Sequence, residues 1–390
     1  MKKTTQLYLI LILFLILFTM NFMWLRKIEN YVKTGKELTE ISHILELTQK
    51  VINTGNSDIF YPPSKGNTYY VGPDGDDSYS KSEAQSYSTP WRTIQKACKS
   101  IEPGDKVIVK DGIYKASPRE RLYVVDLRRG GTKNNWVIFK AENKWGAKIY
   151  CKDNSVHSGW NFEDNANYVC VEGFEIYGFD FSGFWDNHEC HDIFLYNNHI
   201  HTIGRRLPTE DDYLYGRAGI MINHKSRNIT VDNCVIHCIG RLPEPSDTGL
   251  WSHNYKHDHG IYAQGDNVII KNNLIYDCPA GWAIKIDGND FGVSENSHII
   301  ESNIFAFPSN PKRQGHIRFY KNPECKYEPR NVIIMNNIFY RPQGNTAISI
   351  SKGYSAVIKN NIMTCDNFIP SDFKDTQKIL IEDNMKLEIE

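Results

Sequence analysis

A short polar signature recurs along the second half of the chain and limits what it can fold into. Each copy is a run of alternating apolar residues that ends in asparagine, as in residues 267–276, 331–339 and 356–363. Alternation with a period of two is the pattern of a half-buried β-strand. The spacings between marker asparagines are 35, 40, 30, 34, 24 and 23 residues. The markers are Asn198, Asn233, Asn273, Asn303, Asn337, Asn361 and Asn384.

A minimum spacing near 23 residues, with longer spacings elsewhere, indicates a solenoid in which some turns carry insertions. Equivalent asparagines would then stack above one another and share hydrogen bonds at a tight turn. Parallel strands joined by crossovers coil with a right hand. We therefore predict an all-β chain whose main domain, residues 67–390, is a right-handed parallel β-helix (a solenoid), with repeated rungs from about Trp136 onward.

The N-terminus predicts a membrane segment. Residues 7–25 form an apolar run that is long enough to span a bilayer, and no small-residue cleavage site follows it. We assign residues 1–25 to a transmembrane anchor or signal peptide. Residues 26–66 carry apolar positions at spacings of three and four, which predicts a short helical stalk or linker. The domain is then expected to be extracellular or at the cell surface, either anchored in the membrane by the N-terminal helix or secreted.

Charge and cysteine content exclude some partners. The chain has 45 basic and 46 acidic residues and contains no basic block, which argues against a nucleic-acid partner. Nine cysteines occur without any CxxC spacing, so a zinc site built on thiolates is not expected. We expect a monomer whose partner outside the membrane is a polysaccharide.

The start of the solenoid domain carries a recognisable module. A strand at residues 69–75, a short helix at 90–97 and a strand pair over 103–114 follow one another. This module resembles the "YYV-P-G", "P-xx-T-I-Q-x-A" and "PGD-x-V-x-V-x-x-G-x-Y" segments of extracellular β-helix carbohydrate enzymes, including the family-nine pectate lyases. The resemblance implies the fold, and it implies a carbohydrate-active protein of the pectate lyase-like superfamily.

Two neighbouring rungs carry the longest insertions and look like copies. Residues 200–208 match residues 236–243, and each insertion then returns to a strand, at 219–223 and at 260–264. Insertions at equivalent positions of adjacent rungs project from the same face. We predict that loops 205–217 and 241–256 wall a groove beside those strands.

The strands beside this groove should present polar side chains outward, Asp186 among them. A long groove suits a polymer, and aromatic and basic side chains suit an acidic sugar chain. The side chains that we assign to substrate binding are His224, Trp251, Tyr262, Gln264 and Tyr320.

Uronate polymers are cleaved by β-elimination. The reaction needs a cation at the C6 carboxylate and a base for the C5 proton. Family-nine pectate lyases use a lysine base on a groove strand and an aspartate cluster for calcium. The resemblance places the base at Lys285, within Gly281-Trp282-Ala283-Ile284-Lys285-Ile286. Of the calcium ligands it leaves only Asp258 as a match, with Asp287 as a second acidic candidate.

Mannuronan epimerases and alginate lyases give a more distant resemblance. Their Asp-Pro-His-Asp motif is half kept in Tyr255-Lys256-His257-Asp258. Under that resemblance His257 or His259 is the base and Arg318 neutralises the carboxylate. Because epimerisation and elimination share the first proton abstraction, an acidic-polysaccharide lyase and a uronan C5-epimerase both stay open.

Further readings use the same residues. Asp258 and Asp287 are the acids that a hydrolase would need. His257 and His259 are also ligand types for a transition metal, with His224 or His253 as the third ligand. A non-catalytic carbohydrate-binding surface protein, or adhesin, fits the predicted anchor and stalk.

Overall fold

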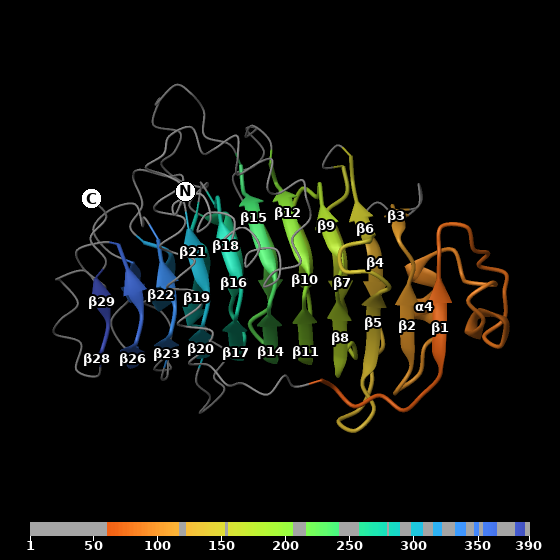
Figure 1. The fold of residues 1–390 in the computed structure, drawn as a ribbon, viewed down its shortest axis with the longest axis horizontal. Helices are drawn as coiled ribbons and strands as arrows, with labels where there is room; N and C mark the ends of the chain where they lie inside the picture. Colours follow the sequence, from red (N-terminus) through yellow and green to blue (C-terminus); the bar gives the residue numbers. More distant parts are fainter. Residues whose placement is uncertain are drawn as a thin grey trace, which may run out of the picture. The chain divides into compact units, whose positions relative to one another are not determined.

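A computed structural model describes residues 61–116, 122–152, 155–205, 216–241, 257–278, 281–288, 298–306, 315–321, 332–340, 347–350, 354–364 and 379–386. All of them belong to one compact unit. The described chain coils through three parallel β-sheets of eleven, eight and ten strands, and the strands of each sheet stack side by side in sequence order (Figure 1). This confirms the predicted all-β parallel β-helix.

The eleven-stranded sheet begins each rung. Its strands are β1 (Thr68–Val71), β2 (Lys106–Val109), β5 (Val137–Ala141), β8 (Val169–Glu172), β11 (His191–Tyr196), β14 (Arg227–Asp232), β17 (Asp266–Lys271), β20 (His298–Glu301), β23 (Val332–Met335), β26 (Ala356–Lys359) and β28 (Ile379–Glu382).

The ten-stranded sheet follows it after a tight turn. Its strands are β3 (Gly112–Tyr114), β6 (Ala147–Tyr150), β9 (Glu175–Tyr177), β12 (His199–Ile203), β15 (Val235–Ile239), β18 (Leu274–Tyr276), β21 (Ile304–Ala306), β24 (Ile338–Phe339), β27 (Ile362–Met363) and β29 (Met385–Lys386).

The eight-stranded sheet closes each rung, and the insertions precede it. Its strands are β4 (Tyr123–Leu127), β7 (Ser158–Phe162), β10 (Ser182–Asp186), β13 (Ala218–Ile222), β16 (His259–Ala263), β19 (Ile284–Gly288), β22 (Ile317–Lys321) and β25 (Ile348–Ile350).

The core is one continuous column of inward-facing side chains. On the eight-stranded sheet, Ile261 pairs with Ile284, Ile284 with Ile317 and Ile317 with Ile348, and all four are buried. Branched apolar residues in register bury the most surface where parallel strands have both faces covered. The same register fixes which residues face outward, and so it builds the outer surface where a site can form.

The tight turn between the eleven- and ten-stranded sheets holds a ladder of buried amides. Asn273 Nδ2 donates to Asn303 Oδ1 at 2.9 Å, and Asn303 Nδ2 donates to Asn337 Oδ1 at 3.0 Å. The ladder continues through Asn361 to Asn384. Each amide therefore satisfies buried polar groups of the neighbouring rungs, as the stacked asparagines predicted.

The predicted ladder was wrong by one residue at a single rung. The backbone N–H of Cys234, not of Asn233, donates to Asn273 Oδ1, at 2.8 Å. Asn233 instead occupies the left-handed position before the ladder, with φ 53°, as Asn197 and Asn272 do. The spacings around this rung are therefore 36 and 39 residues.

The first rungs are capped by a short helix, in agreement with the sequence module. Helix α4 (Ile94–Ser100) starts at Thr93, whose side chain accepts a hydrogen bond from the Lys96 N–H. It buries Ile94, Ala97 and Cys98 against β1 and β4. A single 3₁₀ turn, η1 (Glu83–Gln85), precedes it. An apolar solenoid end needs such a cover.

The predicted N-terminal segments lie mostly outside the described residues. This holds for 1–25 and for all of the predicted linker except its end. That end contacts the solenoid: the Trp136 N–H donates to the Pro63 carbonyl at 2.7 Å, and Tyr61 donates to Glu172 at 3.2 Å. Strand β1 then begins at Thr68, beside the predicted domain start at residue 67. Within the described ranges no helix is long and apolar enough to cross a membrane.

Candidate functional site on the eight-stranded sheet

One outward row of the eight-stranded sheet brings together three of the predicted site residues. Tyr262 on β16 pairs with Lys285 on β19, and Lys285 pairs with Arg318 on β22. The row continues to Met221 on one side and Ser349 on the other. Because neighbouring strands lie about 4.8 Å apart, side chains in adjacent positions of this row can act on one sugar ring.

The next outward row adds an acid and an aromatic ring. Asp287 pairs with Tyr320, and each lies two residues beyond the first row on its own strand. Residues two apart on a strand face the same side. Gln264 directly follows β16, in register beside Asp287, because Ala263 pairs with Ile286. The two rows thus place a lysine, an arginine, an acid and two tyrosines on one face.

Asp287 is the centre of the polar contacts in this cluster. Its Oδ2 lies 3.0 Å from Lys285 Nζ and accepts a hydrogen bond from the Tyr262 hydroxyl at 2.6 Å. The side chains of Lys285 and Asp287 are only 11% and 14% exposed, so the ion pair is poorly screened by water. Lys285 Nζ also lies 5.0 Å from the ring centre of Tyr262 and 5.6 Å from that of Tyr320. The ammonium group is therefore held in place on three sides.

The guanidinium of Arg318 is held by stacking. Its Cζ lies 5.2 Å from the ring centre of Tyr320 and 5.7 Å from that of Trp282. Such cation–π contacts orient the planar group without using its N–H donors. Among the contacts of the described residues, the buried Nε of Arg318 and the buried Oδ1 of Asp287 have no hydrogen-bond partner.

Tyr262 is kept neutral at this site. Burial raises the pKa of its hydroxyl, and the charge and hydrogen bond of the Asp287 carboxylate raise it further. The phenol is therefore a hydrogen-bond donor to Asp287 at ordinary pH.

The two histidines proposed as alternative bases have different environments. His257 is exposed, whereas His259 is only 1% exposed. His259 Nδ1 accepts a hydrogen bond from the Trp282 backbone N–H at 3.0 Å. This contact engages the Nδ1 lone pair, which is the basic site of a neutral imidazole, and the buried ring is not open to a substrate, so His259 is a poorer candidate base than His257.

Asp258 has a structural setting that does not fit a calcium ligand. Arg241 donates to it twice from its side chain, from Nε at 2.9 Å and from Nη2 at 2.6 Å. The backbone N–H groups of Arg217 and Arg241 donate to it as well, at 2.9 Å and 2.8 Å. Asp258 and the Arg241 side chain are fully buried. Calcium needs six to eight oxygen ligands. Both carboxylate oxygens of Asp258 already accept hydrogen bonds from the Arg241 side chain and from two backbone N–H groups.

Asp287, the second predicted calcium ligand, offers one uncommitted oxygen beside a lysine and an arginine. Two nearby cations oppose the binding of another cation. The described residues around Asp287 therefore do not fit calcium, and no step of the chemistry below depends on it.

The remaining predicted residues lie farther from the cluster or outside the described residues. His224 follows β13, two strands from β19, which corresponds to about 10 Å along the sheet. Burial, and then the charge of Lys225, lower the pKa of His224. Trp251 and most of both predicted groove loops fall in ranges 206–215 and 242–256, outside the described residues.

One predicted outward residue faces the core instead. Asp186 is in register with Phe162 and Ile222, and it is 4% exposed. Its neighbour Trp185 takes the outward row, in line with Met221. The strand Ser182–Asp186 is buried on both faces except at Trp185. Its pattern of polar and apolar residues therefore did not show which residues face the core and which face outward.

Two partners of predicted site residues were missed from the sequence. Trp282 stacks near Arg318, and Arg241 neutralises Asp258. Trp282 lies three residues before Lys285 in the sequence, so the sequence could have indicated that it lies near the site. The Arg241–Asp258 pair joins the two ends of an insertion, and only the folded rung shows it.

Three parallel sheets that share one coiled core define the parallel β-helix class. Neither the protein-family models nor the curated protein sequences give a match to this chain. Among solved structures, the chain is similar to pectate lyase Pel9A, with TM-score 0.55 and 13% identity over 83% of this chain and 80% of that chain. At this identity the likeness shows the fold, and it confirms the expected resemblance in architecture.

Two further solved structures have lower scores. They are an alginate lyase from Paenibacillus sp. str. FPU-7 (TM-score 0.45, 14% identity, 74% of this chain and 94% of that chain) and the A-module of the mannuronan C-5 epimerase AlgE4 from Azotobacter vinelandii (TM-score 0.41, 11% identity, 72% and 86%).

Proposed function

We propose that this protein is an extracellular polysaccharide lyase that cleaves an acidic, uronate-containing polysaccharide by β-elimination. One observation carries the proposal: Lys285 and Arg318 are neighbours in one outward row, and Asp287 anchors the lysine from the next row. A fixed cation beside a positioned amine is the pair of groups that this reaction needs. The N-terminal apolar run supports export of the domain.

Arg318 is suited to bind the C6 carboxylate of the substrate. Its charge is permanent, and its planar fork matches a carboxylate. As the C5 proton leaves, negative charge spreads onto the carboxylate, so a nearby cation stabilises the transition state more than the ground state.

Lys285 is suited to take the C5 proton in its neutral form. The C5–H electron pair then forms the C4–C5 double bond, the C4–O bond breaks, and the leaving oxygen takes up a proton. The resulting ammonium is stabilised by Asp287 at 3.0 Å, and it can return its proton to the leaving oxygen. Asp287 acts through Lys285 and Tyr262, so it is a positioning residue.

A screen of uronans tests the proposal. The full-length chain is mixed with pectate, alginate and other uronans, and the ultraviolet absorbance of the unsaturated product is followed. We expect product with at least one polymer. Lys285→Ala should abolish it, whereas Lys271→Ala should not, because Lys271 is a strand lysine with an acidic neighbour, Asp232, at 3.5 Å on another sheet. Melting curves of both variants check that they fold.

The pH profile separates the two bases. With Lys285 as base, activity should rise toward alkaline pH as the amine loses its proton. With His257 as base, activity should rise near the ordinary imidazole pKa of about 6.5, and His257→Ala should be inactive.

The screen also detects the competing functions. Inversion at C5 without chain cleavage, seen by NMR, indicates an epimerase that shares the first step. Binding of a uronan without turnover indicates a carbohydrate-binding surface protein. Full activity of folded Lys285→Ala contradicts the lysine mechanism.

A further inference from the structure

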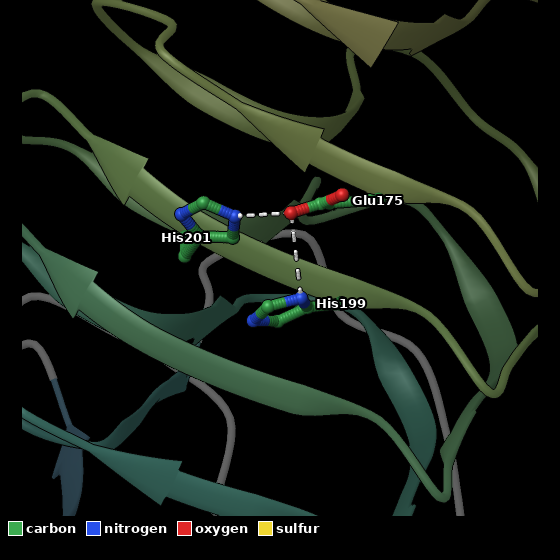
Figure 2. A group of neighbouring side chains, drawn as sticks. All are labelled: Glu175, His199 and His201. Atoms are coloured by element: carbon green, nitrogen blue, oxygen red, sulfur yellow. Dashed lines mark hydrogen bonds and ion pairs between the residues drawn. The ribbon is translucent and has the colours of Figure 1, made fainter. Parts of the chain in front are cut away.

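A second polar cluster lies on the outer face of the ten-stranded sheet. Glu175 is the first residue of β9, and His199 is its partner in register at the start of β12. His201 lies two residues farther along β12 and therefore faces the same side as His199. Figure 2 shows the two imidazoles turned toward the Glu175 carboxylate from the neighbouring strand.

Within this cluster three ligand atoms converge. Glu175 Oε1 lies 3.1 Å from His201 Nε2 and 3.8 Å from His199 Nδ1, and one atom from each residue lies within 4.8 Å of the other two. Metal–ligand distances of about 2.0–2.1 Å place tetrahedral ligand atoms roughly 3.3 Å apart. Small rotations would bring the three atoms to that spacing. From this geometry we infer that Glu175, His199 and His201 form a binding site for a divalent transition metal ion.

The other nitrogen of each imidazole already has a partner. His201 Nδ1 lies 2.9 Å from Thr202 Oγ1, and His199 Nε2 lies 2.8 Å from His237 Nε2. His237 Nδ1 in turn lies 3.1 Å from Cys238 Sγ. Metal-bound histidines almost always donate their second N–H to such an outer partner, which fixes the tautomer.

With a metal bound, every imidazole N–H in this network has an acceptor. His201 donates to Thr202, His199 donates to His237, and His237 donates to Cys238. The second oxygen of Glu175 pairs with Lys148, which leaves Oε1 as the ligand atom. The Lys148 charge opposes a cation, and its pairing with Glu175 offsets this effect.

The imidazole rings are held in orientation by neighbouring rings. His201 stacks between Tyr177, at 4.8 Å, and His237, at 5.1 Å, with interplanar angles of 10° and 3°. Trp145 lies 4.8 Å from the ring centre of His199. A ligand set whose rotamers are fixed before the metal arrives loses less entropy on binding.

The donor set selects the kind of metal. Calcium and magnesium prefer oxygen ligands only, whereas two imidazoles and one carboxylate suit Zn²⁺ or Fe²⁺. The three side chains are 14–16% exposed, so an ion can reach them and an exchangeable ligand can complete its coordination. The site is separate from the lysine–arginine cluster, and it does not depend on the proposed lyase activity.

Titration of the chelator-treated full-length chain with Zn²⁺ tests this site. Calorimetry of the wild-type chain and of a His199→Ala/His201→Ala variant should differ by one bound equivalent. Glu175→Gln keeps the size of the side chain and removes its charge, so it should weaken binding while the melting temperature stays close to that of the wild-type chain without metal. His237→Ala, which removes an outer partner, should weaken binding about 10–100-fold.

A surface histidine on another sheet gives the matched control. His191→Ala should leave Zn²⁺ binding unchanged, because His191 pairs with Asp192 on the eleven-stranded sheet. Co²⁺ bound in place of Zn²⁺ should give the visible absorption of a tetrahedral nitrogen–oxygen site, and the double variant should lose it. The assignment is overturned if the wild-type chain binds no Zn²⁺, or if the folded double variant binds as many equivalents with equal affinity.

Discussion

Arg241 and Asp258 form an ion pair in which both side chains are fully buried, with Arg241 Nη2 2.6 Å from Asp258 Oδ1. These residues flank range 242–256, so the pair joins the two ends of the longer groove insertion at its base. The same carboxylate accepts the backbone N–H of Arg217, which follows the shorter insertion. One aspartate thus contacts the last residue of the predicted loop 205–217 and the first residue of the predicted loop 241–256.

Removing one partner of this pair should destabilise the protein strongly. Asp258→Leu leaves a buried guanidinium without its counterion, which costs about 3–5 kcal/mol of unfolding free energy. Chemical denaturation measures this loss. A double variant, Asp258→Leu with Arg241→Met, should recover part of the stability, because no unpaired guanidinium remains at this position while the backbone N–H groups of Arg217 and Arg241 still lose their acceptor. Equal stability of Asp258→Leu and the wild-type chain would contradict the role of the pair.

Arg318 should affect catalysis through charge and shape. If the lyase proposal holds, Arg318→Gln should lower kcat/KM by about 100–1000-fold, as for loss of a transition-state donor. Arg318→Lys keeps the charge but loses the planar fork, so it should retain more activity than the glutamine variant. Initial rates on the uronan found in the screen give both values. An unchanged kcat/KM in Arg318→Gln would remove this residue from the mechanism.

Asp186 should make stability fall as pH rises. Burial raises its pKa from 3.8 to about 7, so the folded state keeps the proton while the unfolded state loses it between those values. Asp186→Asn stays neutral at every pH and is free of this effect. The stability advantage of Asp186→Asn over the wild-type chain should therefore widen by about 2–3 kcal/mol between about pH 5 and pH 8. Urea unfolding at both pH values measures it, and a constant gap would contradict it.

The amide ladder predicts that replacing Asn303 lowers the stability of the protein much more than replacing Asn134, which lies outside the ladder. Asn303 donates to the Ile270 carbonyl at 2.8 Å and accepts the Asn273 backbone N–H at 3.0 Å. Asn303→Leu leaves these buried groups without partners, each of which costs about 1–3 kcal/mol. Asn134 is exposed, and Asn134→Leu should change stability by less than about 0.5 kcal/mol. Thermal unfolding of the two variants should show clearly different midpoints.

The fold could be predicted because a solenoid repeats its local signals. From Asn198 onward each rung repeats the alternation and an asparagine at the turn, so the copies support one another even where a single copy is weak. The error at Cys234 arose because two positions of the turn both favour asparagine. One needs a left-handed backbone, as at Asn233 with φ 53°, and the next needs a buried amide. Sequence alone cannot separate these two requirements at a rung that has one asparagine.

Placement of the candidate site residues depended on register. Lys285 and Arg318 lie 33 positions apart in the sequence, and their pairing follows only from the length of the intervening rung. The catalytic roles proposed for them stay predictions. The metal site was missed for a related reason. His199 and His201 lie on one strand and could be seen to share a face, but Glu175 joins them only through pairing with the rung before.

The regular stacking of the rungs also has a kinetic consequence. Each strand pairs with strands one full turn away in the sequence, so no hairpin can form first as a local seed. A new rung must close a loop of 23 to 39 residues onto a rung that is already ordered. Helix α4 and β1 supply the first such template, and they lie at the N-terminal end of the described coil. A chain that crosses a membrane with its N-terminus first would therefore order its rungs in the sequence in which they emerge, each one acting as the template for the next.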